Sequence, residues 1–441
     1  MAWGLSVAMS EHNIGLMAVL VMMLMILVRV PIAVSMLITG VVGNIYFLGF
    51  DATLVQFQLL SWEIATNFIL ISLPLFIWMG QLGYSSGVGS DLYHCFYKWF
   101  GHRPGGLAVS STISTASFGA VTGSSVATVM TMGKMLMPEM KRYHYSPSLA
   151  SGSLASAGVL AILIPPSVPL VFYGAWTETS IGDLFIAGVI PGILLTLLFS
   201  VYIWIYCFFK PSAGPAGQKF PLSEKLHSLV NLLPFLSVMF LVLGSIYGGI
   251  ATTSEAAAVG VAGMLMVALV KKRLNKAVLS ESIGESSKLS SNIFLLLLGG
   301  GVFSRFLVQT DLTGSLIQGV TDMHLSPYFV LVLLVLMYLL LGAIIDTFGM
   351  IILTLPFVFP LVISMGVDPI WFGVFIVMMI ELALITPPIG LNVIVMKQVV
   401  PDVGLIDIYK GTFPFVLLCL LMVGLLIIFP EIALWLPDQV R

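Results

Sequence analysis

The sequence predicts an all-α polytopic membrane protein that contains an internal repeat, and three observations support this fold class. Hydrophobic residues make up 59% of the 441 residues, whereas charged residues make up only 9%. A soluble domain carries about 25% charged residues, so most of this surface must face lipid or other apolar groups. Continuous apolar runs recur along the chain, and proline pairs recur at the same spacing in its two halves.

The apolar runs have the length of about 20 residues that a helix needs to cross the hydrocarbon core of a bilayer. At that length the chain holds roughly ten to twelve membrane-spanning helices. The clearest runs are Ile14–Val28, Leu184–Phe209, Leu229–Ile246, Tyr328–Ile345 and Phe413–Phe429.

Prolines at matching positions indicate a duplication. Pro387 and Pro388 follow Pro165 and Pro166 at the same distance, and other prolines and glycines keep nearly this spacing. The alternative is a coincidental spacing of prolines. Repeated halves are the usual construction of secondary transporters, whose binding site lies near the bilayer midplane between broken helices.

The repeat divides the chain into five predicted parts. Scaffold helices at 1–60 precede a first repeat at 61–192, which belongs to the transport core. Scaffold helices with cytoplasmic interfacial segments at 193–290 precede a second repeat at 291–414. The end of the C-terminal helix and the tail occupy 415–441.

Two basic segments, Lys210–Ser228 and Lys271–Lys288, orient the middle of the chain. An excess of Lys and Arg marks cytoplasmic loops, and the connection Tyr247–Ser254 between the enclosed apolar runs has no basic residue. Both segments are therefore expected on the cytoplasmic side, the second as a helix lying at the interface. Glu255 follows a Thr-Thr-Ser run and is expected to cap a helix N-terminus.

Each Pro-Pro pair is expected to break a helix and free backbone oxygens. A proline has no N–H and clashes with the carbonyl four residues before it. Four carbonyls should thus lose their helical partners, namely those of Ala161, Ile162, Ala383 and Leu384.

Free carbonyls at membrane depth cost about several kcal/mol each unless a cation, water or hydroxyl satisfies them. Side chains with hydroxyl or carboxylate oxygens lie near both breaks in the sequence and favour an oxygen-only cation site. The alternative is a pair of proline kinks packed against small residues. The candidate oxygen ligands are Thr122, Ser124, Ser125, Thr128, Asp346, Thr347 and Thr386.

A small organic anion is the expected cargo. Backbone N–H groups at a half-helix N-terminus hold carboxylates or sulfonates, and a Gly-Ser-Ser segment is placed for that role. Arg305 is a further candidate, with snorkelling or pairing to a nearby acid as its alternative. Glu381, near the second break, is a functional candidate because ionisable groups in apolar surroundings are costly. The predicted substrate-binding residues are Gly123, Ser124, Ser125, Asn67, Ser167, Asn392 and Arg305.

The sequence gives little support to catalysis. It contains no HExxH, GxSxG or Walker-type motif, so zinc, serine-hydrolase and ATP-hydrolysing mechanisms lack a basis. No cofactor and no nucleic-acid partner is expected. The alternative from another class is an intramembrane lipid-modifying enzyme, which would require an acid or His cluster that the sequence does not display.

These segments resemble the DctM family, the large membrane subunit of tripartite ATP-independent periplasmic (TRAP) transporters. The resemblance runs over nearly the whole chain, and several motifs occur in the family's order. The matching segments are 72–80, 122–125, 161–167 with 173–174, 177–192, 253–260, 342–360 and 381–392.

The resemblance implies an elevator-type carrier of the bacterial inner membrane, with inverted repeats and two re-entrant helical hairpins. It implies import driven by sodium ions, with a periplasmic substrate-binding protein (DctP-like) that delivers the anion. It also implies a small four-helix membrane subunit (DctQ-like), expected as a separate chain because few residues precede the first apolar run. The alternative within transport is a stand-alone sodium-coupled anion symporter.

Carried over residue by residue, the resemblance also implies two sodium sites built largely from backbone oxygens. Relatives often have Ser in place of Thr122, and Gly in place of Ala161 and Ala383, so the alanine methyl groups are expected to crowd the ions. The first site falls on Thr122, Ser125, Ala161, Ile164 and Pro166, and the second on Gly342, Ile345, Ala383, Thr386 and Ile389.

Overall fold

The computed structural model describes residues 11–440, in which all regular secondary structure is helical. The chain divides into two compact units. The first comprises Met1–Asn67, Ser291–Leu333 and Phe348–Val367, and the second comprises Phe68–Ser290, Leu334–Thr347 and Asp368–Arg441. The second predicted repeat thus contributes to both units, whereas the first lies almost wholly in the second unit. The predicted part boundaries stay predictions, and residues 1–10 of the first part lie outside the described residues.

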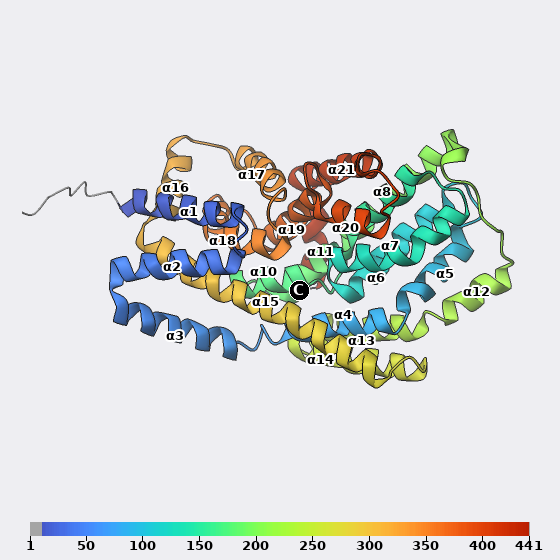
Figure 1. Ribbon diagram of the computed structural model, residues 1–441, viewed down its shortest axis with the longest axis horizontal. Coiled ribbons are helices and arrows are strands. Elements are labelled where there is room, and N and C mark those ends of the chain that lie inside the picture. Colours follow the sequence, from blue (N-terminus) through green and yellow to red (C-terminus); the bar gives the residue numbers. More distant parts are fainter. Residues whose placement is uncertain (1–10, 441) are drawn as a thin grey trace, which may run out of the picture. The chain divides into compact units, whose positions relative to one another are not determined.

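The first unit contains three N-terminal helices and segments from the second half of the chain (Figure 1). Its helices are α1 (Glu11–Leu27), α2 (Ile32–Leu48), α3 (Phe50–Thr66), the later part of α15 (Lys276–Gln309), α16 (Leu312–Asp322), the first part of α17 (Pro327–Leu341) and nearly all of α18 (Thr347–Ser364).

Glycines let α2 approach α15 closely within this unit. A Cβ on Gly40 would lie 2.8 Å from the Cα of Phe303, so the two backbones almost touch. Asn44 lies at the same contact, where its side chain donates to the carbonyl of Val302 at 3.1 Å and accepts from Gln309 at 2.6 Å. A buried amide with these partners avoids the cost of unsatisfied polar groups.

The second unit holds the remaining helices. These are α4 (Ser72–Ser85), α5 (Val88–Phe100), α6 (Gly106–Thr122), α7 (Ser125–Arg142), α8 (Pro147–Ala157), α9 (Leu160–Leu163), α10 (Val168–Thr177), α11 (Ile181–Phe209), η1 (Pro211–Ala213), α12 (Leu222–Val230), α13 (Leu233–Tyr247), α14 (Thr253–Val270), α19 (Pro369–Ile385), α20 (Leu391–Val399), α21 (Leu405–Ile428) and α22 (Glu431–Val440).

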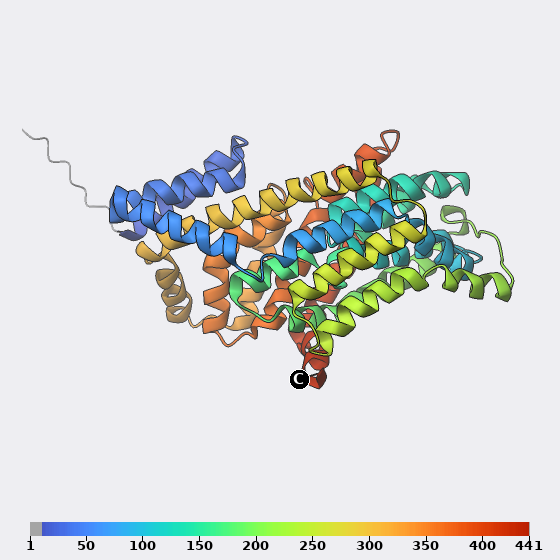
Figure 2. The ribbon, with the colours of Figure 1, turned by 90° about the horizontal axis from the view of Figure 1, so that it is seen from below.

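Helix α6 forms the centre of the second unit, where it packs against α4, α5, α7, α8, α9 and α11. Nearly all of its residues are buried, although many carry hydroxyl groups. Several of these hydroxyls donate to carbonyls one turn earlier, as Ser110 does to Gly106 at 2.7 Å and Ser114 does to Ser110 at 2.6 Å, whereas those of Ser111 and Thr115 have no partner. The small side chains of α6 therefore allow many helices to pack around it. Figure 2 shows α4, α13 and α14 running side by side in the same unit.

The described helices fit a polytopic membrane protein. Five are long and apolar enough to cross a membrane by length and composition. Two bent helix pairs raise this number to seven if each pair is one span, while four further apolar helices are shorter. The predicted number of roughly ten to twelve spans stays a prediction. Helix α11 exposes Ile193, Leu197, Val201 and Ile205, which lie four residues apart on one face. Such a stripe is what a lipid-facing helix surface requires.

Two local expectations have clear outcomes. The cap at Glu255 is confirmed: the Thr252 hydroxyl accepts from the Glu255 N–H at 3.3 Å, and the Glu255 carboxylate accepts from the Thr252 N–H at 2.8 Å. The expected separate interfacial helix in Lys271–Lys288 is not observed, because α15 runs without a break from Lys276 to Gln309. No proline interrupts this stretch, so the helix continues into the following apolar run.

Candidate ion and substrate site

The first predicted break lies between α9 and α10 in the second unit. Helix α9 ends at Leu163, and α10 begins at Val168 after the Pro165-Pro166 pair. Both prolines are buried. Ser167, a predicted substrate-binding residue, is the N-cap of α10, and its hydroxyl accepts from the N–H of Leu170 at 3.4 Å.

The turn between α6 and α7 faces this break. Gly123 ends α6 in the left-handed conformation, with φ of 57°. A Cβ on Gly123 would lie 3.6 Å from the carbonyl oxygen of Pro166, so the turn and the break are in contact. The Thr122 and Thr128 hydroxyls are 2.5 Å apart, and Ser124 caps α7 by accepting from the Ala127 N–H at 3.4 Å. The structure thus brings together the predicted first sodium site and the Gly-Ser-Ser segment.

Both breaks contact a glycine on a facing element. A Cβ on Gly119 of α6 would lie closer than 3.0 Å to the Cα of Ala161, and a Cβ on Gly342 would lie closer than 3.0 Å to the Cβ of Ala383. Gly119 and Gly342 occupy corresponding places in the two predicted repeats. The Ala383 methyl group was expected to crowd the ion. In the structure it packs against Gly342, where the absence of a side chain leaves room for it.

The second break lies between α19, which ends at Ile385, and α20, which begins at Leu391. The Ala383 carbonyl has no α-helical partner because residue 387 is a proline, but it is not bare as expected, since the Thr386 N–H donates to this oxygen at 3.3 Å across a tight turn. The carbonyl still has a second lone pair for a cation. The Thr386 hydroxyl donates to the Leu382 carbonyl at 2.6 Å.

A hydroxyl that sequence reasoning missed satisfies part of this break. The Tyr409 OH on α21 lies 2.8 Å from the Pro388 carbonyl oxygen and 2.7 Å from the Ile389 carbonyl oxygen. A neighbouring hydroxyl was one of the expected ways to satisfy freed carbonyls, but no motif pointed to Tyr409. Its only sequence signal is its position in the helix that follows the second break.

Glu381 connects the two repeats at the centre of the second unit. Its side chain is fully buried on α19. Its Oε1 accepts from the Ser125 hydroxyl at 3.3 Å and from the Thr347 hydroxyl at 3.5 Å. Its Oε2 has no hydrogen-bond partner. A buried carboxylate is costly unless it is paired, so this arrangement suits a site that takes up a cation.

Asn392 is also buried without a partner. Neither the Oδ1 nor the Nδ2 atom of its side chain makes a hydrogen bond. The amide lies beside the bend between α8 and α9, since a Cβ on Gly158 would be 3.1 Å from the Nδ2 atom. An unsatisfied buried amide costs about 1–3 kcal/mol. The predicted substrate-binding role of Asn392 gives those atoms a partner.

Two predicted substrate residues belong to the first unit. Arg305 on α15 pairs with Glu63 on α3 at 3.2 Å and lies 3.5 Å from the Gln56 carbonyl oxygen. Pairing with a nearby acid was the alternative for Arg305, and the structure shows that pair. Asn67 is the C-cap of α3.

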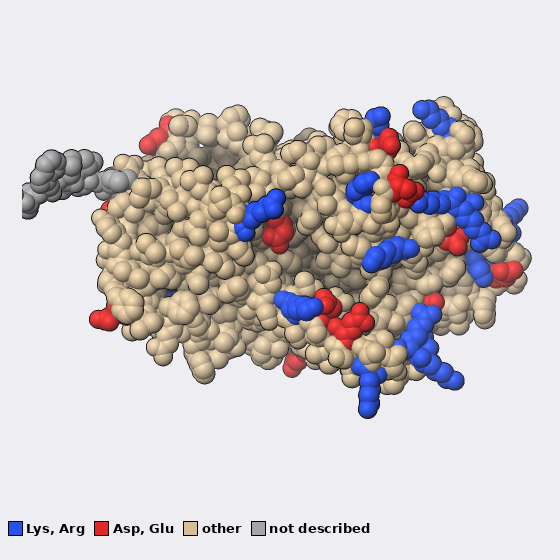
Figure 3. Space-filling view, in the orientation of Figure 1, with Lys and Arg blue, Asp and Glu red and all other residues tan. Residues whose placement is uncertain are grey.

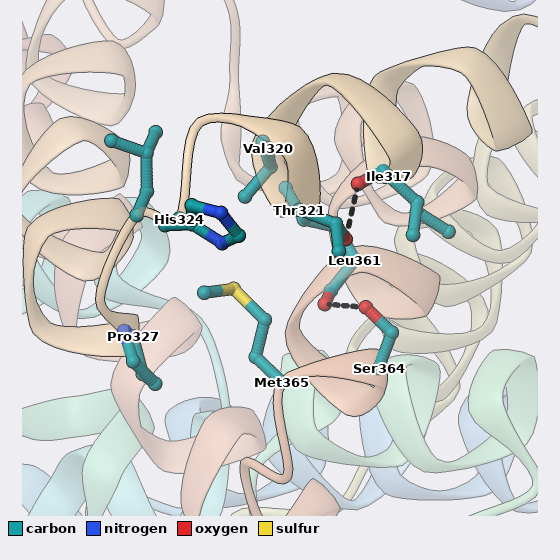
Figure 4. Close-up of a pocket in the computed structure, with 9 residues that line it drawn as sticks. Ile317, Val320, Thr321, His324, Pro327, Leu361, Ser364 and Met365 are labelled. Carbon is teal, nitrogen blue, oxygen red and sulfur yellow. Dashed lines mark hydrogen bonds between the residues drawn. The ribbon is translucent and has the colours of Figure 1, made fainter.

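The first unit also contains an open cavity of about 410 Å³ next to the turn between α16 and α17 (Figure 4). The Thr321 hydroxyl donates to the Ile317 carbonyl at 2.8 Å, and the Ser364 hydroxyl donates to the Leu361 carbonyl at 2.7 Å. Both hydroxyls are therefore satisfied within their own helices. None of the predicted site residues lines this cavity.

Comparison with known sequences identifies clear relatives. Residues 19–432 match the family described as "Tripartite ATP-independent periplasmic transporter, DctM component". The chain is 33% identical over 377 residues to the C4-dicarboxylate TRAP transporter large permease protein DctM of Pseudomonas aeruginosa, covering 85% of this chain and 88% of that protein. It is 31% identical over 370 residues to the ectoine TRAP transporter large permease protein TeaC of Halomonas elongata, covering 84% and 86%.

A solved structure shows a similar fold. The YdaH transporter of Alcanivorax borkumensis aligns with a TM-score of 0.62, covering 97% of this chain and 98% of that chain at 13% identity. At this identity the likeness shows the fold alone.

Proposed function

The chain belongs to the DctM family of tripartite ATP-independent periplasmic transporters, and from this premise we propose that it imports a small organic anion together with sodium ions. The relatives are large permease subunits of transporters. The cargo proposed here is a carboxylate or sulfonate that crosses the bacterial inner membrane by an elevator-type movement. A periplasmic binding protein delivers it, and a small four-helix subunit accompanies the permease.

The observation that carries this proposal is the carboxylate of Glu381 between the two repeats. Ser125 begins the helix after the first turn, and Thr347 begins the helix after the second. Both hydroxyls donate to the same carboxylate oxygen, while the other oxygen is buried and unpaired. Backbone oxygens carry no formal charge, so Glu381 supplies a negative charge that favours cations beside it.

In this proposal the first sodium ion contacts oxygens of the 122–125 turn and of the break at 161–166. The second contacts oxygens of the 342–345 turn and of the break at 383–389. Hard cations are bound by such oxygen ligands. The close contacts of Gly119 with Ala161 and of Gly342 with Ala383 support two similarly built sites.

The anion is proposed to bind at the start of α7 and near Asn392. Gly123 ends α6 with its N–H donating to the Gly119 carbonyl at 2.8 Å, and Ser124 caps α7. The dipole of α7 favours negative charge at its N-terminus. The Asn392 amide adds a neutral donor and acceptor. The relatives' names include a C4-dicarboxylate and ectoine, which supports a small polar cargo without selecting one.

Sodium binding is tested on the purified chain without knowing the cargo. A ligand that binds the folded state raises the free energy of unfolding in proportion to the logarithm of its concentration. We expect sodium chloride, but not choline chloride, to raise the unfolding temperature. Ser125→Ala and Thr386→Val should each weaken this sodium effect and leave the unfolding temperature in choline nearly unchanged. An equal response to both salts would reject sodium coupling.

The tripartite assembly is tested by uptake into liposomes. The chain, its small subunit and the purified binding protein are combined with labelled ligand that copurifies with the binding protein. We expect uptake to require the binding protein and an inward sodium gradient. Uptake that proceeds equally well without the binding protein would favour a stand-alone symporter, and uptake under a pure proton gradient would contradict sodium coupling.

A further inference from the structure

At the second break, a side chain from the following helix contacts two consecutive backbone oxygens. The Tyr409 hydroxyl, in the second turn of α21, lies 2.8 Å from the Pro388 carbonyl oxygen and 2.7 Å from the Ile389 carbonyl oxygen. A phenolic hydroxyl has a single proton to donate, whereas each carbonyl oxygen has two lone pairs. The two oxygens therefore converge on one hydroxyl that satisfies only one of them fully at a time.

The backbone at Gly390 explains why these oxygens lie outside a helix. Gly390 adopts the left-handed conformation, with φ of 55°, immediately before α20. The N–H of Val393 would serve the Ile389 carbonyl in a continuous helix, but it donates to the Gly390 carbonyl at 2.8 Å. The Pro388 and Ile389 carbonyls are thus outside the hydrogen-bond ladder of α20 and available to a partner on another element.

The second break is also more accessible than the first. Pro387 and Pro388 are exposed, and Ile389 is 45% exposed, whereas both prolines of the first break are buried. Tyr409 is half-buried beside them. A small ion can therefore reach the Pro388 and Ile389 oxygens without the opening of the protein interior.

Charged side chains surround the start of α21, near Tyr409. In the connection between α20 and α21, Asp402 pairs with Lys141 at 2.7 Å, and Lys397 donates to two backbone carbonyls of this connection. Figure 3 shows basic and acidic side chains next to one another over the part of the second unit where α7 and α8 lie, and α8 packs against α21. Ionised side chains are costly in the hydrocarbon core, so this end of α21 faces water.

The first repeat has an apolar residue at the corresponding position. Tyr409 precedes Gly411 by two residues, and Ile186 precedes Gly188, the matching glycine of the first repeat, by two residues. Ile186 is buried and has no hydroxyl to donate. The two breaks are thus built from the same proline pair but differ in the side chain that the following helix supplies.

Given the sodium coupling proposed above, we propose that the Tyr409 hydroxyl stands in for the cation at the second break and turns its proton away when sodium binds. Before binding, the hydroxyl donates to the Pro388 and Ile389 oxygens. A hard cation takes the lone pairs of such oxygens, so it must displace this proton. Tyr409 is therefore a positioning residue that lowers the sodium affinity of the second break and keeps its ion exchangeable.

The proposal is tested by equilibrium binding of radioactive sodium to the purified full-length chain. Tyr409→Phe removes the hydroxyl and keeps the ring. The ion-free chain then loses a hydrogen bond that the sodium-bound chain does not make, so the Kd for sodium should fall about fivefold, which corresponds to the roughly 1 kcal/mol that such a bond contributes. The unfolding temperature of this variant should fall in choline chloride and recover in sodium chloride.

Two further variants separate this role from a general effect on the fold. Tyr173→Phe is the matched control, because the Tyr173 hydroxyl on α10 donates to the Pro369 carbonyl at 2.7 Å in the same unit. It should lower the unfolding temperature equally in both salts and leave the Kd for sodium unchanged. Tyr409→Leu removes the ring as well and should tighten sodium binding as Tyr409→Phe does, because the hydroxyl alone competes with the ion.

Three results would overturn the role of Tyr409 while leaving sodium coupling intact. An unchanged Kd in Tyr409→Phe would show that water takes the place of the hydroxyl. A higher Kd would show that the hydroxyl holds the carbonyls in place for the ion or binds the ion itself. Equal tightening in Tyr173→Phe would show a general loosening of the unit. A wild type that binds no sodium would instead reject both the proposed function and this role.

Discussion

The contact between Gly342 and Ala383 gives the sharpest test of how the second break is built. A methyl group added by Gly342→Ala would lie closer than 3.0 Å to the Cβ of Ala383, whereas ordinary contacts begin at 3.4 Å. Such overpacking costs about 1–3 kcal/mol. We therefore expect Gly342→Ala to lower the free energy of unfolding by that amount and to weaken the sodium effect on the unfolding temperature.

The distances from a Cβ on residue 342 to the atoms of Ala383 predict which second substitution restores the stability. When Ala383→Gly removes the clashing Cβ, the next atom is the Ala383 Cα at 3.1 Å, which needs a shift of only a few tenths of an ångström. The double variant should therefore be more stable than Gly342→Ala alone, although glycine in a helix itself costs about 1 kcal/mol. In the first repeat the Cα of Ala161 itself lies within 3.0 Å of a Cβ on Gly119, so Ala161→Gly should not rescue Gly119→Ala.

Thermal unfolding of the purified variants in sodium and in choline chloride measures both effects. The control is Gly424→Ala on α21, where an added Cβ meets nothing within 4 Å. It should be neutral or stabilise by up to about 1 kcal/mol, because alanine favours helix more than glycine does. The reasoning is refuted if Gly342→Ala behaves like this control, or if Ala383→Gly fails to improve it.

Three further substitutions test individual side chains of the candidate site. Glu381→Gln keeps an oxygen for the hydroxyls of Ser125 and Thr347 but removes the charge, so the sodium concentration at half effect should rise at least about tenfold, equivalent to about 1.4 kcal/mol; an unchanged sodium titration contradicts this role. Asn392→Leu removes an unsatisfied buried amide, so the chain should become about 1 kcal/mol more stable, while KM for uptake rises; a loss of stability with normal uptake would show a structural amide instead. Tyr409→Phe removes the hydroxyl at two carbonyls of the second break and should cost about 1 kcal/mol of stability in denaturant or thermal unfolding; no change would mean that water replaces it.

Much of the local structure could be predicted from the sequence because it depends on neighbouring residues. The apolar run Leu184–Phe209 became α11 close to the expected bounds, whereas α21 ends near the expected residue but begins at Leu405, well before the expected Phe413. The proline pairs ended α9 and α19 because a proline has no N–H and clashes with the preceding turn. The cap formed by Thr252 and Glu255 also follows from chemistry within one turn.

The site itself depends on partners far apart in the chain. The sequence singled out Glu381 for its apolar surroundings but gave no reason to place Ser125 and Thr347 on the same carboxylate oxygen. Nor did it show whether Arg305 faces a ligand or pairs with Glu63. Apolar helices can pack in many registers, and periodicity does not select among them.

The sequence by itself therefore determined a membrane-spanning helical chain with two similar halves, each broken at a proline pair. Hydrophobicity and backbone sterics act over a few residues, so these features need no knowledge of the fold. Tertiary structure alone decided that Gly342 accommodates Ala383, that Tyr409 reaches the second break, and that Asn392 is buried without a partner. Those contacts depend on which helices pack against each other, and this pairing is determined by close packing of side chains throughout the unit.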